Sequence, residues 1–194
     1  MKYLIVYTHP NPWSFNHAIK DAVAEELKKN NKEFQIRDLY KTGFNPVLKA
    51  EDFAEIKRGS VSQDVKTEQD YIRSADVIIF VYPLWWSGMP AMLKGYIDKV
   101  FSEGFAYKIS EKGIEGLLSG KKVFLVTTTG ASREDYEDSG VFKSMGQLID
   151  FGIFGFCGME VIEHLYFSSV PYVTDDDRKR MLEELKEKVR GKLL

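Results

Sequence analysis

Residues 77–100 read VIIFVYPLWWSGMPAMLKGYIDKV, and this stretch decides the fold. The apolar run from Asp76 to Tyr82 predicts a strand that is buried on both faces. Pro and Gly residues then mark a loop, and Pro90 suits the first position of a helix. The buried stripe of that helix is expected at Leu93, Ile97 and Phe101. A strand that feeds a helix through a short loop is typical of α/β proteins with a parallel sheet.

The same alternation continues outward in both directions. Four more strands are predicted, at Lys2–Tyr7, Glu33–Leu39, Lys122–Thr128 and Glu160–Leu165. Helices are predicted after the N-cap Ser14, over Val65–Arg73 and Tyr136–Phe151, and after Thr174, where Thr174 and Asp177 resemble a capping box. Tyr40–Gly59 is expected to be irregular. The chain is therefore predicted to be one α/β domain, residues 1–194, with helices on both faces of a five-stranded parallel sheet.

Composition excludes several classes of protein. The 194 residues are 44% hydrophobic and 29% charged, with a net charge of −2, so neither disorder nor a basic surface for nucleic acid is indicated. The apolar stretch of residues 77–93 is broken by Pro and Gly, and no membrane insertion is expected. One cysteine and three histidines suggest neither a disulfide nor a zinc site. No targeting segment is visible, so we expect a cytoplasmic protein.

In parallel sheets, ligands bind beyond the carboxyl ends of the strands. This places a site on Thr8–Asn16, Pro83–Gly88 and Thr128–Tyr136. The first segment opens a helix, whose free N–H groups suit a phosphate, and His9, Ser14 and Asn16 add donors. The segment matches neither the Walker phosphate-binding loop nor the GxGxxG dinucleotide-binding motif. The alternative is a plain loop in which Ser14 caps the helix and His9 lies on the surface.

The other two segments suit a flat ligand. Trp85 and Trp86 are neighbours in a loop and cannot both point inward easily, so at least one ring is expected to line a pocket; core packing is the alternative. Thr127–Gly130, followed by Arg133 and Tyr136, supplies uncharged donors for the edge of a heteroaromatic ring. Alone, this third signal is weak, because Thr-rich strand ends are common.

Together these segments resemble the flavodoxin-like NAD(P)H:quinone oxidoreductases. The resemblance rests on four places: His9 with Ser14-Phe15-Asn16 and Ala18; Asp38-Leu39-Tyr40 with Phe44-Asn45-Pro46; residues 83–95 with Phe101 and Phe105-Ala106-Tyr107; and Thr128-Thr129-Gly130 with Tyr136. It implies a three-layer flavodoxin-like sandwich with strand order 2-1-3-4-5. It also implies a homodimer that binds FAD, or alternatively FMN, and uses NADPH or NADH to reduce quinones by two-electron, ping-pong hydride transfer. Azo and nitroaromatic compounds would suit the same pocket.

The resemblance also implies residue roles. The cofactor would be held by His9, Ser14, Phe15, Asn16, Ala18, Gln69, Pro83, Leu84, Trp85, Trp86, Ser87, Thr128, Thr129, Gly130, Tyr136 and Arg178. Within that set, Gln69 and Arg178 would serve the adenosine end of FAD, although Arg178 has a surface salt bridge as its alternative. Tyr136 and Gly130 would be catalytic. The quinone or nicotinamide would contact Trp86, Gly130, Tyr107, Phe142 and Phe156, with Tyr107 and Phe156 reaching the partner's site.

One departure from the family concerns Phe142. The best-studied family members pair the tyrosine with a histidine six residues later; that position is Phe142 here, so the pair is incomplete. Two other functions stay open: a flavodoxin-type one-electron carrier, and a regulatory subunit of a potassium-efflux system. A phosphoacceptor receiver domain is excluded, because no acidic pair follows the first strand. Cys157 is expected to be a buried apolar residue, and His17 and His164 to be surface or sheet-edge residues.

Overall fold

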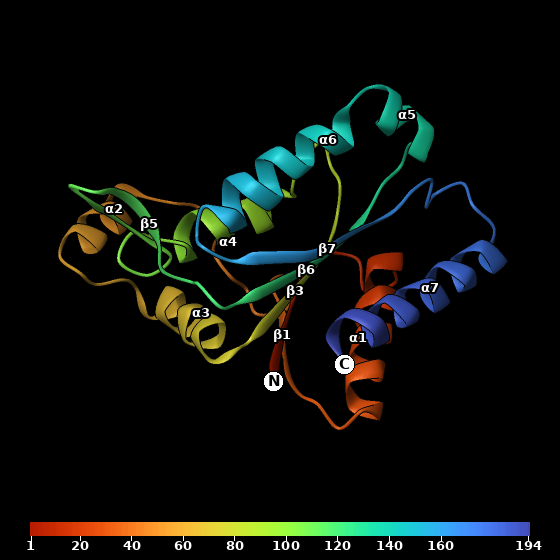
Figure 1. Ribbon diagram of the computed structural model, residues 1–194, viewed down its shortest axis with the longest axis horizontal. Coiled ribbons are helices and arrows are strands. Elements are labelled where there is room, and N and C mark those ends of the chain that lie inside the picture. Colours follow the sequence, from red (N-terminus) through yellow and green to blue (C-terminus); the bar gives the residue numbers. More distant parts are fainter.

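A computed structural model describes residues 1–194, and its centre is a five-stranded parallel sheet with the order β2-β1-β3-β6-β7 (Figure 1). A two-stranded antiparallel hairpin, β4-β5, lies outside this sheet. The elements in chain order are β1 (Lys2–Tyr7), α1 (Phe15–Lys29), β2 (Glu33–Asp38), α2 (Ala50–Lys57), α3 (Gln63–Ser74), β3 (Val77–Pro83), α4 (Ala91–Val100), β4 (Tyr107–Ser110), β5 (Gly113–Gly116), β6 (Lys122–Thr128), α5 (Arg133–Asp138), α6 (Val141–Met145), the π-helix η1 (Gly146–Gly155), β7 (Glu160–Phe167) and α7 (Asp175–Leu193).

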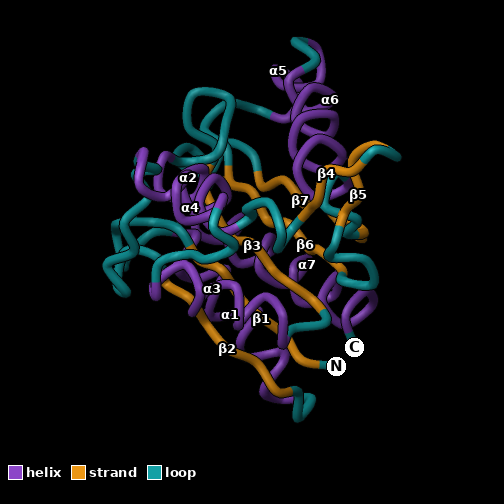
Figure 2. The backbone as a smooth tube through the Cα atoms, turned by 90° about the vertical axis from the view of Figure 1, so that its left-hand side faces the viewer, coloured by secondary structure: helices purple, strands orange, loops and turns teal.

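The helices form two layers, one on each face of the sheet (Figures 1 and 2). Helices α1 and α7 pack on one face, over a core that includes Ile5, Val23 and Leu185. Helices α3, α4 and the η1 segment cover the other face, over a larger core that includes Phe80 and Phe154. Because both faces are covered, β3 is buried along its whole length, as its unbroken apolar run predicts.

The predicted strands and their order are confirmed. The five sheet strands follow one another as 2-1-3-4-5 when the hairpin is left out of the count, which is the flavodoxin-like order. The helix caps are confirmed as well: the Ser14 hydroxyl accepts from the His17 amide, and Thr174 and Asp177 form a reciprocal capping box. Cys157 is buried, and burial raises the pKa of its thiol to about 11, which fits an apolar role.

Three local predictions are wrong, and one element was missed. Pro90 is the N-cap of α4 and not its first helical residue. The stretch expected to be irregular contains α2, whose N-terminus is closed by the Asp52 carboxylate accepting from the Lys49 amide at 2.7 Å. The single helix expected over Tyr136–Phe151 is three segments, because Gly140 takes a left-handed conformation (φ +72°) and the chain continues as a π-helix from Gly146. The β4-β5 hairpin was not predicted at all.

The irregular segment before α2 packs closely against the backbone of α4 at Gly95. An added Cβ at Gly95 of α4 would lie 2.2 Å from the Pro46 carbonyl oxygen, so only glycine fits there. This contact packs the segment after β2 on α4 and leaves the carboxyl edge of the sheet to three other loops. None of the helices combines the length and apolar character needed to cross a bilayer.

Candidate functional site

Three loops from the carboxyl edge of the sheet, together with the segment after β7, line a pocket of about 250 Å³, here called the carboxyl-edge pocket. Its lining consists of His9, Ser14, Phe15, Asn16, Pro83, Leu84, Trp85, Thr128, Thr129, Gly130, Val170 and Pro171. The first ten are residues that the sequence singled out as cofactor-binding, so the fold brings together the three segments predicted to form a site. Val170 and Pro171 were missed, because they follow the last sheet strand and carry no polar side chain.

The part of the pocket that suits a phosphate is the N-terminus of α1. Ser14 caps this helix, and the backbone N–H groups of Phe15 and Asn16 have no hydrogen-bond partner. The first turn carries no acidic side chain, so the positive end of the helix dipole is not neutralised. Free amides and a positive dipole end together favour an anion such as a phosphate.

His9 adds a neutral donor beside this helix end. Its Nδ1 accepts from the Asn11 amide at 3.0 Å, which leaves the proton on Nε2. Burial lowers the pKa of His9, so the ring stays neutral at neutral pH. Its ring meets that of Trp85 edge-on, with 5.7 Å between the ring centres. His9 is therefore part of the pocket wall and not a free surface residue.

A buried hydrogen bond joins the first and third loops. Asn16 is 3% exposed, and its Nδ2 donates to the Thr128 hydroxyl at 2.7 Å. The Asn16 Oδ1 and Thr8 Oγ1 atoms are buried and have no partner in the protein. An unpaired buried acceptor costs about 1–3 kcal/mol, which a bound polar ligand would relieve. Because the Asn16 Oδ1 atom only accepts, these atoms suit hydroxyl groups of a bound ligand, such as those of the polyhydroxyl chain of a flavin nucleotide.

Replacing Asn16 with Ala is expected to weaken flavin binding by about 10- to 100-fold. The change leaves the Thr128 hydroxyl without its donor and separates the two loops, at a cost of about 1–3 kcal/mol. Titration of the apoprotein with FAD or FMN, followed by flavin fluorescence, measures the affinity. Asn30→Ala is the matched control, because the Asn30 side-chain amide donates one hydrogen bond, to the Glu26 carbonyl, at the other end of α1. Equal flavin affinities of the two variants would remove Asn16 from the site.

The tryptophan loop is a tight turn. The Trp85 amide donates to the Gly88 carbonyl at 3.0 Å, and the Gly88 amide donates back at 3.1 Å. The two central residues, Trp86 and Ser87, both have positive φ (51° and 56°). Trp86 is fully exposed beside the pocket and takes no part in the core, so the core-packing alternative is wrong for this ring. The turn holds Trp85 in the pocket wall and leaves Trp86 exposed to solvent.

Replacing Ser87 with Gly is expected to stabilise the fold. Left-handed backbone costs an ordinary residue about 1–2 kcal/mol, and glycine avoids most of that cost. We expect about 1 kcal/mol of added stability, or a rise of about 2–4 °C in Tm for a chain of this size. Ser139→Gly serves as the control, since Ser139 has an ordinary φ of −73° and gains nothing from glycine. Equal Tm changes in both variants would show that the turn is not strained.

The third loop combines buried hydroxyls with an open glycine. The Thr129 amide donates to the Phe167 carbonyl at 2.8 Å, which fixes the loop to the end of β7. An added Cβ at Gly130 would meet no atom within 4 Å. The fold therefore does not require glycine at this position, and the free space beside it belongs to the pocket.

Several predicted site residues do not line the pocket. Ala18 lies in the first turn of α1, where its amide donates to the Ser14 carbonyl at 3.3 Å. Tyr136 lies on α5 and stacks on Phe142, with 5.2 Å between ring centres. The Arg178 guanidinium donates to the Val170 carbonyl at 2.9 Å and pairs with Asp175 at 2.7 Å. Arg178 thus makes a salt bridge, which was the alternative role given to it, and it also holds Val170 in the pocket wall.

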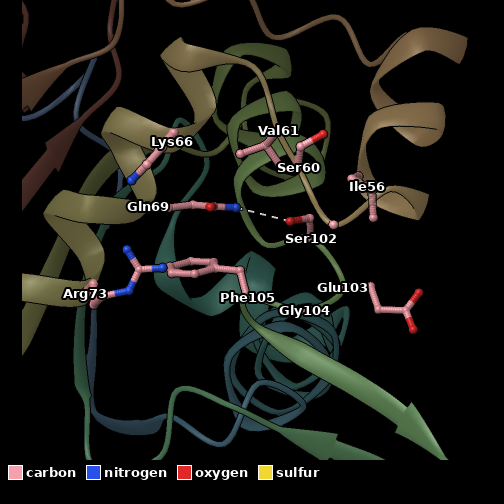
Figure 3. Close-up of a pocket in the computed structure, with 11 residues that line it drawn as sticks. Ile56, Ser60, Val61, Lys66, Gln69, Arg73, Ser102, Glu103, Gly104 and Phe105 are labelled. Carbon is pink, nitrogen blue, oxygen red and sulfur yellow. Dashed lines mark hydrogen bonds between the residues drawn. The ribbon is translucent and has the colours of Figure 1, made fainter.

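Gln69 lies in a different pocket, shown in Figure 3. This second pocket, of about 490 Å³, lies between α2, α3 and the segment after α4, and it shares no lining residue with the carboxyl-edge pocket. Gln69 is 5% exposed, and its amide donates to the Val100 carbonyl and the Ser102 hydroxyl. Its contacts within the chain are therefore structural and do not reach the carboxyl-edge pocket.

The two residues expected to reach a partner lie together, outside the pocket. The rings of Tyr107, on β4, and Phe156, just after η1, meet edge-on at 5.2 Å. Phe156 is partly exposed. Neither lines the carboxyl-edge pocket of its own chain. No group of three or more His, Cys, Asp or Glu side chains is arranged to hold a metal ion.

Comparisons with known proteins agree with this architecture. Residues 1–191 match a protein family described as having the flavodoxin-like fold. An uncharacterized NAD(P)H oxidoreductase of Haemophilus influenzae is 39% identical over all of this chain and 96% of its own length. NAD(P)H dehydrogenase [quinone] 1 of Rattus norvegicus is 35% identical over 96% of this chain and 75% of its own.

A solved structure is similar over almost the whole chain. The NAD(P)H:quinone oxidoreductase of Methanothermobacter marburgensis superposes with a TM-score of 0.87 and 29% identity, covering 98% of each chain. Sequence relatives above 30% identity and this structural match agree on one group of proteins. The chain belongs to the flavodoxin-like NAD(P)H:quinone oxidoreductase family.

Proposed function

We propose that this chain is a flavoenzyme that reduces quinones with NADPH or NADH as electron donor. The observation that carries the proposal is the carboxyl-edge pocket, in which a free helix N-terminus faces uncharged donors and a tryptophan wall. This combination suits a ligand with a phosphate at one end and a flat ring at the other. The family to which the chain belongs supports an NAD(P)H oxidoreductase.

The residues of the pocket divide into two parts for a flavin. Phe15 and Asn16 amides, with His9, would hold the phosphate, while Trp85, Thr129 and Gly130 would border the ring system. When bound, a flavin supplies the two-electron redox chemistry that amino-acid side chains lack. We propose FAD, with FMN as the alternative. Arg178 beside the pocket supports FAD. Gln69 lines the second pocket of this chain, and its role at the adenosine end stays a prediction.

The proposed reaction is NAD(P)H + H⁺ + quinone → NAD(P)⁺ + hydroquinone, in two half-reactions at one pocket. Because donor and acceptor would use the same face, the first product leaves before the quinone enters, and the kinetics are ping-pong. The Gly130 amide and the Tyr136 hydroxyl are proposed to donate to negative charge that develops on the ring edge. Tyr136 stacks on Phe142, whose side chain has no ionisable group and cannot exchange a proton with it.

An absorbance spectrum of the purified protein tests this function. Flavin bands that bleach when NADPH or NADH is added without oxygen, and return with menadione, are expected. Acid extraction and comparison with standards then identify FAD or FMN. Bands absent after incubation with both flavins would overturn the proposal and favour a regulatory role. A long-lived semiquinone during turnover would overturn the two-electron reaction and favour a one-electron carrier.

We also propose a homodimer that works in the cytoplasm. Large apolar side chains lie exposed on the η1 segment, just after it and on the β4-β5 hairpin, namely Leu148, Phe151, Phe156, Ile109 and Ile114. Exposed apolar clusters of this kind mark protein interfaces. The single, buried cysteine is compatible with a reducing compartment.

A further inference from the structure

The second pocket is lined mainly by polar residues, and its volume of about 490 Å³ lies in the range of sites for small molecules. One wall is helix α3, which presents Lys66, Gln69 and Arg73 on a single stripe, because these residues are three and four positions apart. The other walls are residues 59–61, between α2 and α3, and residues 102–105, after α4 (Figure 3). Three separate segments therefore surround one face of α3.

In the middle of the α3 wall, Gln69 keeps a free hydrogen-bond acceptor. The residue is 5% exposed, and its Nε2 donates to the Val100 carbonyl at 3.0 Å and to the Ser102 hydroxyl at 3.1 Å. A carbonyl only accepts, so the contact with Val100 fixes the orientation of the amide. The Oε1 atom then accepts no hydrogen bond from the chain. Buried acceptors are normally paired, so this atom suits a ligand group that donates.

Ser102 supplies a donor next to this acceptor. The residue is also 5% exposed, and its hydroxyl oxygen accepts from Gln69 Nε2, which leaves the hydroxyl proton available. The pocket thus presents one acceptor and one donor side by side, both on buried residues. The hydroxyl groups of a sugar both donate and accept, so neighbouring sugar hydroxyls would satisfy the two atoms.

Two cations border the same pocket. The Lys66 ammonium and the Arg73 guanidinium bind the two oxygens of the Asp70 carboxylate, at 2.8 and 2.5 Å, so the cations lie close together. All three side chains are exposed, and such surface ion pairs contribute little and exchange easily. The Phe105 ring lies 5.2 Å from the Arg73 guanidinium and holds it at the pocket. The Glu103 carboxylate points away from both cations (Figure 3). A phosphate dianion would displace the single carboxylate from them.

We propose that the second pocket binds a phosphorylated sugar, either free or in a mononucleotide. Lys66 and Arg73 would hold its phosphate, and Gln69 and Ser102 its hydroxyl groups. The inference goes beyond the proposed function and does not depend on it, because the two pockets share no lining residue. The competing account is the prediction that Gln69 serves the adenosine end of FAD.

NMR titration of the nitrogen-15-labelled protein with ribose 5-phosphate tests the site, with unphosphorylated ribose as the control ligand. The amide signals of Ser60, Ser102 and Gly104 are expected to shift with ribose 5-phosphate and to stay in place with ribose. Absence of shifts at millimolar concentrations would overturn the inference, and so would an equal response to ribose. Shifts confined to Phe15 and Asn16 would place the phosphate at the N-terminus of α1 and also overturn it.

Two substitutions on the surface of α3 change the cations in opposite directions. Arg73→Gln removes one phosphate ligand and is expected to weaken ribose 5-phosphate binding by about 10-fold. Asp70→Asn removes the competing carboxylate and is expected to strengthen binding by about 3-fold. Arg180→Gln is the matched control, because Arg180 pairs with Asp177 three residues earlier on α7, as Arg73 does with Asp70 on α3. Unchanged affinity in both α3 variants would overturn the inference.

The affinity of the same variants for FAD separates the inference from the competing account. Arg73→Gln is expected to keep the wild-type affinity for FAD. If it loses affinity for FAD together with ribose 5-phosphate, the pocket serves the cofactor, and the inference is overturned while the proposed function stands. If the wild type binds no flavin, the proposed function fails, and the ribose 5-phosphate titration still decides the inference by itself.

Discussion

Replacing Gly130 with Leu is expected to abolish flavin binding while the apoprotein keeps its wild-type stability. An added Cβ at Gly130 meets nothing within 4 Å, and the residue lacks the positive φ that favours glycine. The fold therefore tolerates a side chain, but the open space is that of the carboxyl-edge pocket, of about 250 Å³. A leucine there competes directly with a ring. We expect flavin affinity to fall by at least about 100-fold, or roughly 2.7 kcal/mol.

Two measurements on the same samples separate binding from folding. The melting temperature of the apoprotein reports the fold, and fluorescence titration with FAD and FMN reports the affinity. Gly191→Leu is the matched control, because Gly191 also has open space around it but lies on α7, away from the pocket. If Gly130→Leu binds flavin as wild type does, the flavin ring does not lie beside this loop. If the Gly130→Leu apoprotein melts far below wild type, the fold has no room for a side chain at this position.

The carboxyl-edge pocket was predictable because its parts are local in sequence. Each lining segment follows a strand that its own apolar run identifies, and parallel strands place their carboxyl ends at one edge. The Asn16–Thr128 hydrogen bond spans 112 residues, yet both residues were found from their strands alone. Only Val170 and Pro171 were missed, since nothing in their chemistry signals a ligand.

The elements that were missed are those with little apolar periodicity. Helix α2 has no buried residue, so no helical stripe identifies it. The hairpin is largely exposed, and its position depends on a long-range approach: an added Cβ at Gly116 would lie 2.3 Å from the Cys157 carbonyl carbon. A π-helix shifts the repeat away from 3.6 residues, so the pattern after Gly146 could not be read correctly.

His164 was expected to be a surface or sheet-edge residue, and its burial, with a side chain 6% exposed, was not foreseen for a similar reason. Its partner Asp150 is 14 residues earlier, on the π-helix, where helical spacing gives no guide to which side chains face β7. Gln69 depends on contacts of the same kind. The resemblance assigns it to the cofactor, which stays a prediction, and within this chain α3 directs its amide to the Val100 carbonyl. Contacts between segments, and not local pattern, determine both outcomes.

Replacing Leu148 and Phe151 with Asp is expected to turn a dimer into monomers. Both side chains are apolar and largely exposed, at 69% and 78%, on the η1 segment. If this surface is the proposed interface, two carboxylates there must lose their hydration when the chains associate, at a cost of several kcal/mol. The dimer dissociation constant should rise by more than about 100-fold. Light scattering after size-exclusion chromatography measures the mass at several protein concentrations.

Activity and flavin content of the same double variant distinguish an interface from a general loss of structure. Because Tyr107 and Phe156 are proposed to complete the partner's site, the monomer should keep its flavin and lose quinone reduction. Phe53→Asp is the control, since Phe53 is also apolar and exposed, but lies on α2. A monomeric wild type would remove the dimer from the proposal. A double variant that stays dimeric and active would place the interface on another face of the sheet.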